Sequence, residues 1–251
     1  MKKNLIKIYD TILALNIFFF KWILIKFRKR GPENLPITSK FLKKSGLYPI
    51  IKHYYDPKFE YSDDEKKLYL NRSLKSINLK ETNQLELLKN FNFKNELLEL
   101  NLNQGSKEFS FKFNNGSFEK GDAEIYYQMI RYFKPKKIIE VGSGHSTLIA
   151  MEAIKKNESE NINTSIKCIE PYENPWLEKL DLELLREPLE KTKLNWSEEL
   201  NENDIFFLDS SHIIRPDGDV LKFYLEILPK LRSGVIIHIH DIFTPKNYLP
   251  N

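Results

Sequence analysis

The chain lacks several features that would place it in a familiar class of protein. Among its 251 residues there is a single cysteine, Cys168, which excludes an internal disulfide, a CxxC redox pair and a cysteine-based zinc finger. No internal repeat recurs with a period of about 20 to 50 residues, as solenoids and propellers require. With 41% apolar and 29% charged residues, the chain is neither a polytopic membrane protein nor fully disordered. These absences predict a globular protein of a reducing compartment, the cytoplasm.

Basic residues are concentrated at the amino terminus. Residues 1–30 contain eight Lys or Arg residues against Asp10 and carry a net charge of +7, whereas the whole chain carries +4 and residues 31–251 therefore carry −3. Nucleic-acid binding needs a basic face on the folded domain, so we expect no nucleic-acid partner.

An apolar run occupies residues 5–27 but contains no long uncharged stretch. It is interrupted by Lys7, Asp10, Asn16, Lys21 and Lys26. The longest clean stretch, 11–20, is half of the roughly 20 residues that a membrane-spanning helix needs. The run is followed by a basic cluster and not by a small-residue cleavage site, which argues against a signal peptide. Two alternatives remain open: a helix in peripheral contact with an anionic membrane, with Trp22 and residues 18–20 inserted, or a helix docked on the protein's own body or on a partner subunit.

The middle of the chain predicts little regular structure. Residues 31–80 are punctuated by prolines and are expected to form an extended connection. Helical spacing follows over 82–98, with Thr82 as a candidate N-cap, and alternating phenylalanines over 109–113 predict a strand that ends in a turn. We therefore divide the chain into a basic apolar helix (1–30), an irregular and helical extension (31–118) and a regular domain (119–251).

The regular domain alternates helices with short apolar strands. The strands are predicted at 137–141, 165–170, 204–209 and 234–240, with a weaker one at 182–186, and the helices at 122–133, 146–156 and 220–231. Apolar strands separated by helices of this length pair in parallel, with helices on both faces of the sheet. The fold class is therefore α/β, a doubly wound and mostly parallel sheet, and its ligands should bind at the carboxyl ends of the strands.

Polar residues follow these strands at their carboxyl ends. Gly142 and Gly144 stand in a loop after the first strand, where they permit a tight turn and close approach of the backbone to a ligand. Glu170 follows the second strand, residues 209–212 (DSSH) the third, and the pair His240 and Asp241 the fourth. One GxG is weak evidence alone, but an acid at three strand ends and a His-Asp pair at the fourth predict a functional site.

Some of these residues also have a purely structural interpretation. Cys168 lies in an apolar strand and is expected to be a core residue. His238 is equally well explained as a satisfied buried histidine and as a site residue. Asp209 and Asp241 are expected to be functional, because a buried carboxylate without a partner is unfavourable.

Residues 121–250 resemble a class I S-adenosylmethionine-dependent methyltransferase. The bacterial subgroup concerned is marked by the strings IEVGSGHSTL, CIEPY, FFLDSSH and IIHIHDIFTP, as they stand here. The resemblance implies a Rossmann-like domain that binds S-adenosyl-L-methionine and methylates a hydroxyl of a small molecule or glycan. It implies the cofactor-binding residues Glu140, Gly142, Ser143, Gly144, Ser146, Glu170, Tyr172 and Asp209. Ser146 stands where the family has its third glycine.

The end of the chain departs from this family pattern. Members continue past the fifth strand with a helix and an antiparallel strand pair, whereas this sequence ends at Asn251, about ten residues after GVIIHIHD. We expect a domain that is incomplete at its carboxyl end, either a fragment or an early end of the gene. The strand at 234–240 would then present an open edge, which favours pairing in a homo-oligomer.

Two chemistries are open for the predicted catalytic residues His240, Asp241 and His212. In O-methyltransferases that resemble catechol O-methyltransferase, strand-end carboxylates hold magnesium, and by position the candidate metal ligands here are Asp209, His240 and Asp241. A histidine in that set suits a softer divalent ion or no metal. The alternative, which we slightly favour on sequence, is a metal-free site with His240 or His212 as general base.

Other functions fit the sequence less well. A nicotinamide dehydrogenase would need a glycine at position 147, where threonine stands, and the hydrolase motif G-x-S-x-G is also incomplete. The strongest alternative is a non-catalytic cofactor-binding or interaction module on a truncated methyltransferase fold.

Overall fold

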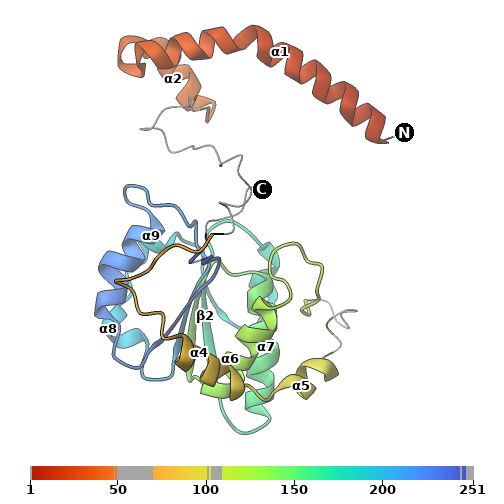
Figure 1. Cartoon of the computed structure of the whole chain (residues 1–251), viewed down its shortest axis with the longest axis vertical. Helices are drawn as coiled ribbons and strands as arrows, with labels where there is room; N and C mark the ends of the chain where they lie inside the picture. Colours follow the sequence, from red (N-terminus) through yellow and green to blue (C-terminus); the bar gives the residue numbers. More distant parts are fainter. Residues whose placement is uncertain are drawn as a thin grey trace. The chain divides into compact units, whose positions relative to one another are not determined.

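The computed structural model describes residues 2–47, 49, 70–100, 102, 109–243 and 245–246. The chain forms two compact units, one of residues 1–71 with 246–251 and the other of residues 72–245 (Figure 1). Much of the irregular connection predicted before residue 80, at positions 48 and 50–69, lies outside the described residues.

The described part of the first unit is mostly helical. Helix α1 (Lys2–Arg30) contains the whole apolar run, and the positive charges of its last turn face the negative end of the helix dipole. The short 3-10 helix η1 (Pro32–Asn34) and helix α2 (Pro36–Lys44) follow. The expectation of irregular structure is wrong for α2, because Pro36 occupies the first turn, where a helix needs no N–H donor.

The second unit begins with two short helices, α4 (Glu81–Lys89) and α5 (Lys94–Glu99). The prediction of one continuous helix with a Thr82 cap is wrong, since α4 ends at Lys89, α5 begins only at Lys94 and the N-cap position of α4 is Lys80. The predicted strand at 109–113 is also wrong. Phe111 and Phe113 are buried against the core with ring centroids 5.4 Å apart, so these side chains anchor the segment without a partner strand.

The sheet confirms the predicted fold class. Its strands are β1 (Lys137–Val141), β2 (Ser165–Ile169), β3 (Glu183–Leu185), β4 (Ile205–Leu208) and β5 (Ile236–Ile239). All pair in parallel in the order β3-β2-β1-β4-β5. The order reverses direction between β1 and β4, which is the switch point where open α/β sheets bind ligands. Among the described residues, β5 forms one edge of the sheet.

Helices cover both faces of the sheet (Figure 1). Helices α6 (Asp122–Phe133) and α7 (His145–Glu158) lie on one face, and the short elements of the chain between β3 and β5 lie on the other. These elements are η3 (Leu189–Lys191), α8 (Trp196–Glu199), α9 (Asp219–Leu221), the π-helical η4 (Lys222–Ile227) and η5 (Leu228–Lys230). The 3-10 helix η2 (Pro175–Lys179) precedes β3, and its Trp176 packs on the same side as α6 and α7. The helix predicted over 220–231 is present as one continuous helical stretch over 219–230, which is first α-helical, then π-helical and finally 3-10, with Pro229 in its last turn.

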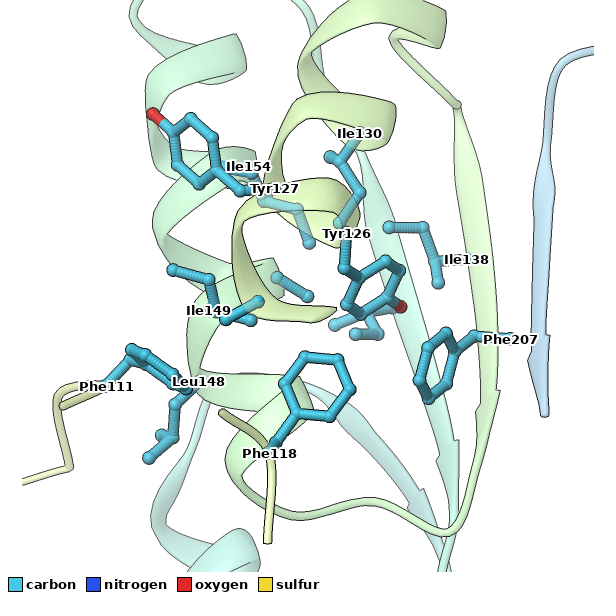
Figure 2. Packing of buried hydrophobic residues seen from close by; sticks show 14 of the residues in the cluster. Phe111, Phe118, Tyr126, Tyr127, Ile130, Ile138, Leu148, Ile149, Ile154 and Phe207 are labelled. Atoms are coloured by element: carbon cyan, nitrogen blue, oxygen red, sulfur yellow. The ribbon is translucent and has the colours of Figure 1, made fainter. Parts of the chain in front are cut away.

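Alternation along β1 divides the core in two. Ile138 faces α6 and α7, whereas Ile139 and Val141 face the elements around η3 and η4. Figure 2 shows the first cluster, in which Phe118 and Tyr126 pack against Phe207 with ring centroids 5.9 and 4.3 Å from it. Both faces of the sheet are therefore buried, as expected of a parallel sheet.

A buried arginine joins α5 to α6. The side chain of Arg131 is 1% exposed, and its Nε and Nη2 atoms lie 2.7 and 3.0 Å from the two carboxylate oxygens of Glu96. Its guanidinium also donates to Asn157 and Glu160, and the Tyr127 hydroxyl donates to Glu96 at 2.9 Å. Arg131 and Asn157 are buried while Glu160 lies at the surface, so the guanidinium connects the interior of the network with solvent-exposed charge.

Replacing Arg131 with methionine is expected to lower the free energy of unfolding by about 3 to 5 kcal/mol, because Glu96 loses its cation in a partly buried position. The matched control is Lys134→Met, which removes an ion pair to Glu160 whose two side chains are 41% and 37% exposed. That change should cost less than about 1 kcal/mol. Urea unfolding of the two variants measures both, and equal losses would contradict the network.

Candidate functional site

A cavity of about 350 Å³ opens at the carboxyl ends of β1, β2 and β4. It is lined by Val141, Gly142, Ile169, Glu170, Pro171, Tyr172, Glu173, Pro188, Leu189, Glu190, Asp209, Ser210, Ser211, Arg215 and Asp219. Its volume lies within the range of small-molecule sites, and its position is the switch point of the sheet. The cavity is therefore the candidate ligand site.

Gly142 allows the loop after β1 to lie against the end of β4. Its φ is +80°, and its N–H donates to the Ile169 carbonyl at 3.0 Å. A Cβ at this position would stand 1.7 Å from the carbonyl oxygen of Asp209. Only glycine fits, because both the backbone conformation and the contact exclude a side chain.

The buried side chain of Glu140 stabilises the same loop. It is fully buried, and its Oε1 accepts hydrogen bonds from the hydroxyls of Ser146 and Thr147 at 2.9 and 2.5 Å, while the Tyr126 hydroxyl donates to Oε2 at 3.0 Å. Burial raises the pKa of Glu140 to about 7, although these hydrogen bonds oppose the rise. The carboxyl group therefore fastens the start of α7 to β1.

This raised pKa predicts a pH dependence of stability. A carboxyl whose pKa is higher in the folded than in the unfolded state stabilises the fold at low pH, and this contribution disappears as pH rises from about 4.5 to about 7. Glu140→Gln removes this dependence. The free energy of unfolding of the variant minus that of wild type should therefore be more favourable at pH 8 than at pH 5, by up to about 3 kcal/mol. Urea unfolding at both pH values measures this gain.

Glu158→Gln on the exposed surface of α7 is the matched control, and it should follow the wild-type pH dependence. If Glu140→Gln also followed the wild-type dependence, Glu140 would not be titrating in the folded protein within this window.

Glu170 is held in a pre-organised loop. Its Oε1 accepts the N–H groups of Tyr172 and Glu173 at 2.9 and 2.8 Å. Arg186 donates to the carbonyls of Glu170, Glu173 and Asn174, and the Asn174 side-chain amide donates to the Ser143 carbonyl at 3.1 Å. The sequence does not point to Arg186 and Asn174, because neither belongs to a motif and their role is visible only once the two loops meet.

The predicted catalytic residues come together beside the cavity. Nε2 of His212 lies 3.1 Å from Oδ1 of Asp209, and Nδ1 of His240 lies 3.4 Å from the same oxygen. Asp241 Oδ2 is 3.6 Å from both His212 Nε2 and His240 Nδ1. One ligand atom each from Asp209, His240 and Asp241 lies within 4.8 Å of the others. Asp209 also lines the cavity, so it connects the cluster with the ligand site.

A third acid reaches the far side of the His240 ring. Oδ2 of Asp122, the first residue of α6, lies 3.4 Å from His240 Nε2, and the Phe118 ring lies 5.1 Å from the imidazole. Asp122 is not among the site residues predicted from the sequence, since nothing in the sequence places α6 beside the end of β5. Each ring nitrogen of His240 therefore faces carboxylate oxygen.

The electrostatics of the cluster follow from these contacts. Burial lowers the pKa of His240, but the carboxylates of Asp209, Asp241 and Asp122 raise it more, to about 9. His240 Nδ1 is buried and makes no hydrogen bond within the described residues. His238 differs, because burial and the nearby His240 lower its pKa to about 4, and its ring packs edge-on against Tyr126 and Phe207. The cluster thus concentrates negative charge around one buried ring nitrogen.

Backbone strain is also present here. His212 and Asp241 both adopt left-handed backbone conformations, with φ of 57° and 56°. Such conformations are uncommon outside glycine and are concentrated at functional sites. Here they turn both side chains toward Asp209.

The predicted cofactor residues divide into two groups. Gly142, Glu170, Tyr172 and Asp209 line the cavity. Glu140, Ser143, Gly144 and Ser146 are outside that lining and lie in the buried network that shapes the loop, where Ser143 donates to the Glu140 carbonyl at 3.3 Å. Their contacts with a cofactor stay a prediction.

Comparison with known proteins finds a family match for this region. Residues 139–242 match the family described as "Methyltransferase domain". The matched segment begins in β1 and ends just after Asp241. It contains the glycine loop, Glu170 and the cluster formed by Asp209, His212, His240 and Asp241. The match supports the predicted resemblance at the level of a methyltransferase domain over these residues, while the subgroup and the early end of the chain stay predictions.

Individual similar proteins cover only parts of the chain. An uncharacterized protein of Archaeoglobus fulgidus is 40% identical over 97 residues, which are 37% of this chain and 43% of that protein. The chain thus spans less than half the length of the curated relative it matches. A solved structure of a Plasmodium falciparum protein-L-isoaspartate O-methyltransferase, in complex with S-adenosyl-L-homocysteine, is 17% identical with a TM-score of 0.37, and covers 66% of this chain and 84% of that chain.

Proposed function

We propose that this chain transfers a methyl group from S-adenosyl-L-methionine to a hydroxyl group of a small molecule or glycan. The observation that supports it is the shared position of Asp209, which lines the switch-point cavity and also belongs to the cluster of acids and histidines. A donor in the cavity and an acceptor at the cluster would then meet at one residue. Alignment of this kind is the main requirement of methyl transfer.

The residues around the cavity suit the proposed cofactor. Glu170 would accept hydrogen bonds from the ribose hydroxyls, because both of its own backbone hydrogen bonds go to Oε1. Gly142 brings the backbone to the cavity wall, where no side chain obstructs a ligand. The bound cofactor supplies an activated methyl group on a sulfonium.

A divalent cation is also part of the proposal. Asp209, His240 and Asp241 offer two carboxylates and an imidazole, and the buried Nδ1 of His240, which faces both acids, makes no hydrogen bond within the described residues. This donor set fits a first-row divalent ion such as Mn²⁺ better than Mg²⁺. A cation there would lower the pKa of an acceptor hydroxyl. Asp122 would hold the other ring nitrogen and so orient the imidazole.

His212 is then the better-placed general base. Its side chain is 31% exposed, so it can meet an acceptor, and Asp209 at 3.1 Å can stabilise the imidazolium that forms. The ring of His240 is enclosed by three carboxylates, which suits a metal ligand better than a base that meets the acceptor. This division of roles replaces the slight preference for His240 as base that the sequence suggested.

Calorimetry with S-adenosyl-L-homocysteine, followed by methyl-transfer assays on sugars and phenols with and without Mn²⁺, tests the proposal. We expect binding, and turnover that a chelator abolishes and Mn²⁺ restores. Binding without turnover on any acceptor would favour the cofactor-binding module instead. Absence of binding would reject both functions.

The cofactor site can be tested at one residue. Glu170→Ala should weaken binding of S-adenosyl-L-homocysteine by about 1.5 to 3 kcal/mol for each strong hydrogen bond between the carboxylate and the ribose that the change removes. Because the alanine also releases the N–H groups of Tyr172 and Glu173, Glu170→Gln is the milder companion and should weaken binding less. Glu198→Gln, an exposed acid of α8 outside the cavity lining, is the matched control. Unchanged affinity in Glu170→Ala would remove this residue from the site.

A further inference from the structure

Helix α1 exposes a large apolar surface. Within its unit, every large apolar side chain from Leu5 to Leu24 is at least 39% exposed. Segment Leu5–Arg30 is long and apolar enough, by length and composition, to cross a membrane. A continuous apolar surface of this size marks a place where something else binds.

Between residues 5 and 24, the charged side chains of α1 lie on one narrow stripe. Lys7 and Lys21 are fourteen residues apart, which is about four helical turns, and Asp10 lies three residues from Lys7. Most other positions around the helix carry large apolar side chains, and the polar side chains of Thr11 and Asn16 donate hydrogen bonds to carbonyls one turn back in the helix. The side opposite the stripe presents Ile12, Phe19 and Ile23, which are 52%, 72% and 58% exposed. This part of the helix therefore has a thin polar side and a broad apolar side.

The helix is strongly basic, and its charge is concentrated toward its last turn. It carries eight basic residues against Asp10, and its last three residues are Arg28, Lys29 and Arg30. Lys21 extends past two aromatic rings, with Nζ 4.1 Å from the ring centroid of Phe18 and 5.4 Å from that of Trp22. Such a lysine covers apolar surface with its stem while its ammonium group stays in water. This charge is complementary to an anionic lipid surface.

The spacing of the charged residues along α1 argues against a membrane-crossing orientation. Asp10 and Lys21 are eleven residues apart, which is about 16 Å along a helix. The hydrocarbon core of a bilayer is about 30 Å thick, so a helix centred between them would bury both charges in it. A helix lying in the membrane plane keeps both at the headgroups and inserts Ile12, Phe19 and Ile23.

We propose that α1 lies in the plane of an anionic membrane, with its charged stripe and its basic last turn at the lipid headgroups and its broad apolar side among the acyl chains. Trp22 is adjacent to Lys21 at the border of the stripe, where tryptophan is favoured at the membrane interface. The helix thereby attaches the chain peripherally to the membrane surface.

The test is flotation of the full chain with vesicles of phosphatidylcholine alone or mixed equally with phosphatidylglycerol. We expect binding to the anionic vesicles, weakened about tenfold or more by raising the salt concentration from about 0.1 to about 1 M. The triple variant Lys7→Glu/Lys21→Glu/Lys29→Glu should bind at least about tenfold more weakly, as should Phe19→Ser/Ile23→Ser. Lys89→Glu/Lys193→Glu, which reverses exposed charges outside α1, is the control and should bind normally.

Three results would overturn the proposal. Equal binding to neutral vesicles with resistance to alkaline carbonate extraction would indicate a helix that crosses the bilayer. Normal vesicle binding by the α1 variants would place the membrane contact elsewhere. Absence of vesicle binding, with self-association that Phe19→Ser/Ile23→Ser abolishes in light scattering, would make α1 a protein-docking helix.

Discussion

Replacing His240 with alanine is expected to lower turnover on a verified acceptor by about 10² to 10⁴ and to weaken Mn²⁺ binding by more than about tenfold. The reason is geometric: Nδ1 of His240 faces Asp209 at 3.4 Å and Asp241 at 3.6 Å, so the alanine removes one of the three proposed ligands from the cluster. Mn²⁺ titration followed by electron paramagnetic resonance measures the binding independently of activity. Cofactor affinity should stay near wild type, because His240 is outside the cavity lining.

Companion variants separate a ligand from a base. His240→Asn keeps an oxygen near the Nδ1 position and should retain part of the Mn²⁺ affinity. Asp122→Asn leaves the ligands intact but loosens the ring, so about 10- to 100-fold weaker binding is expected. His145→Ala is the matched control, since His145 bonds to Ser117 and belongs to neither cavity nor cluster. If His240→Ala abolished turnover while the wild-type protein bound no divalent ion, His240 would act as a metal-free base.

Replacing Gly142 with alanine is expected to destabilise the fold by about 3 to 5 kcal/mol, the range reached by severe backbone conflicts. Two effects combine at this position. The φ of +80° disfavours any side chain, and the new Cβ would meet the Asp209 carbonyl oxygen at 1.7 Å. Relief would require the loop after β1 to move away from β4, which would open the cavity. We therefore also expect loss of S-adenosyl-L-homocysteine binding in any folded Gly142→Ala protein.

Gly116 provides a control with nearly the same backbone. Its φ is +82°, but a Cβ there would meet nothing within 4 Å. Gly116→Ala should therefore cost only the left-handed backbone conformation, about 1 to 2 kcal/mol. Urea unfolding of both variants isolates the close contact from the conformational cost. Equal destabilisation would mean that Gly142 is needed for its φ alone and that the loop is not tightly packed against β4.

Local patterns were sufficient for most of the α/β domain. Short apolar strands and amphipathic helices predicted all five strands, because a parallel sheet buried on both faces requires strands of this kind. They failed at Phe111 and Phe113, where the alternation of buried and exposed side chains arises without a partner strand. They also failed at Pro36, which begins a helix where a break was expected. Periodicity indicates which side chains are buried. Whether the segment is a β-strand depends on a neighbouring strand to which its backbone can hydrogen-bond.

The sequence by itself determined which residues carry the candidate chemistry, because strand ends in a parallel sheet converge on one edge and place Gly142, Glu170, Asp209 and the His240–Asp241 pair there. Only the tertiary structure decided how they act on one another. It directed Glu140 inward to the hydroxyls of Ser146 and Thr147, and it brought Asp122 within 3.4 Å of His240 from 118 positions away in the chain. Distances between residues far apart in sequence depend on how helices pack across the sheet, and no local pattern records that packing.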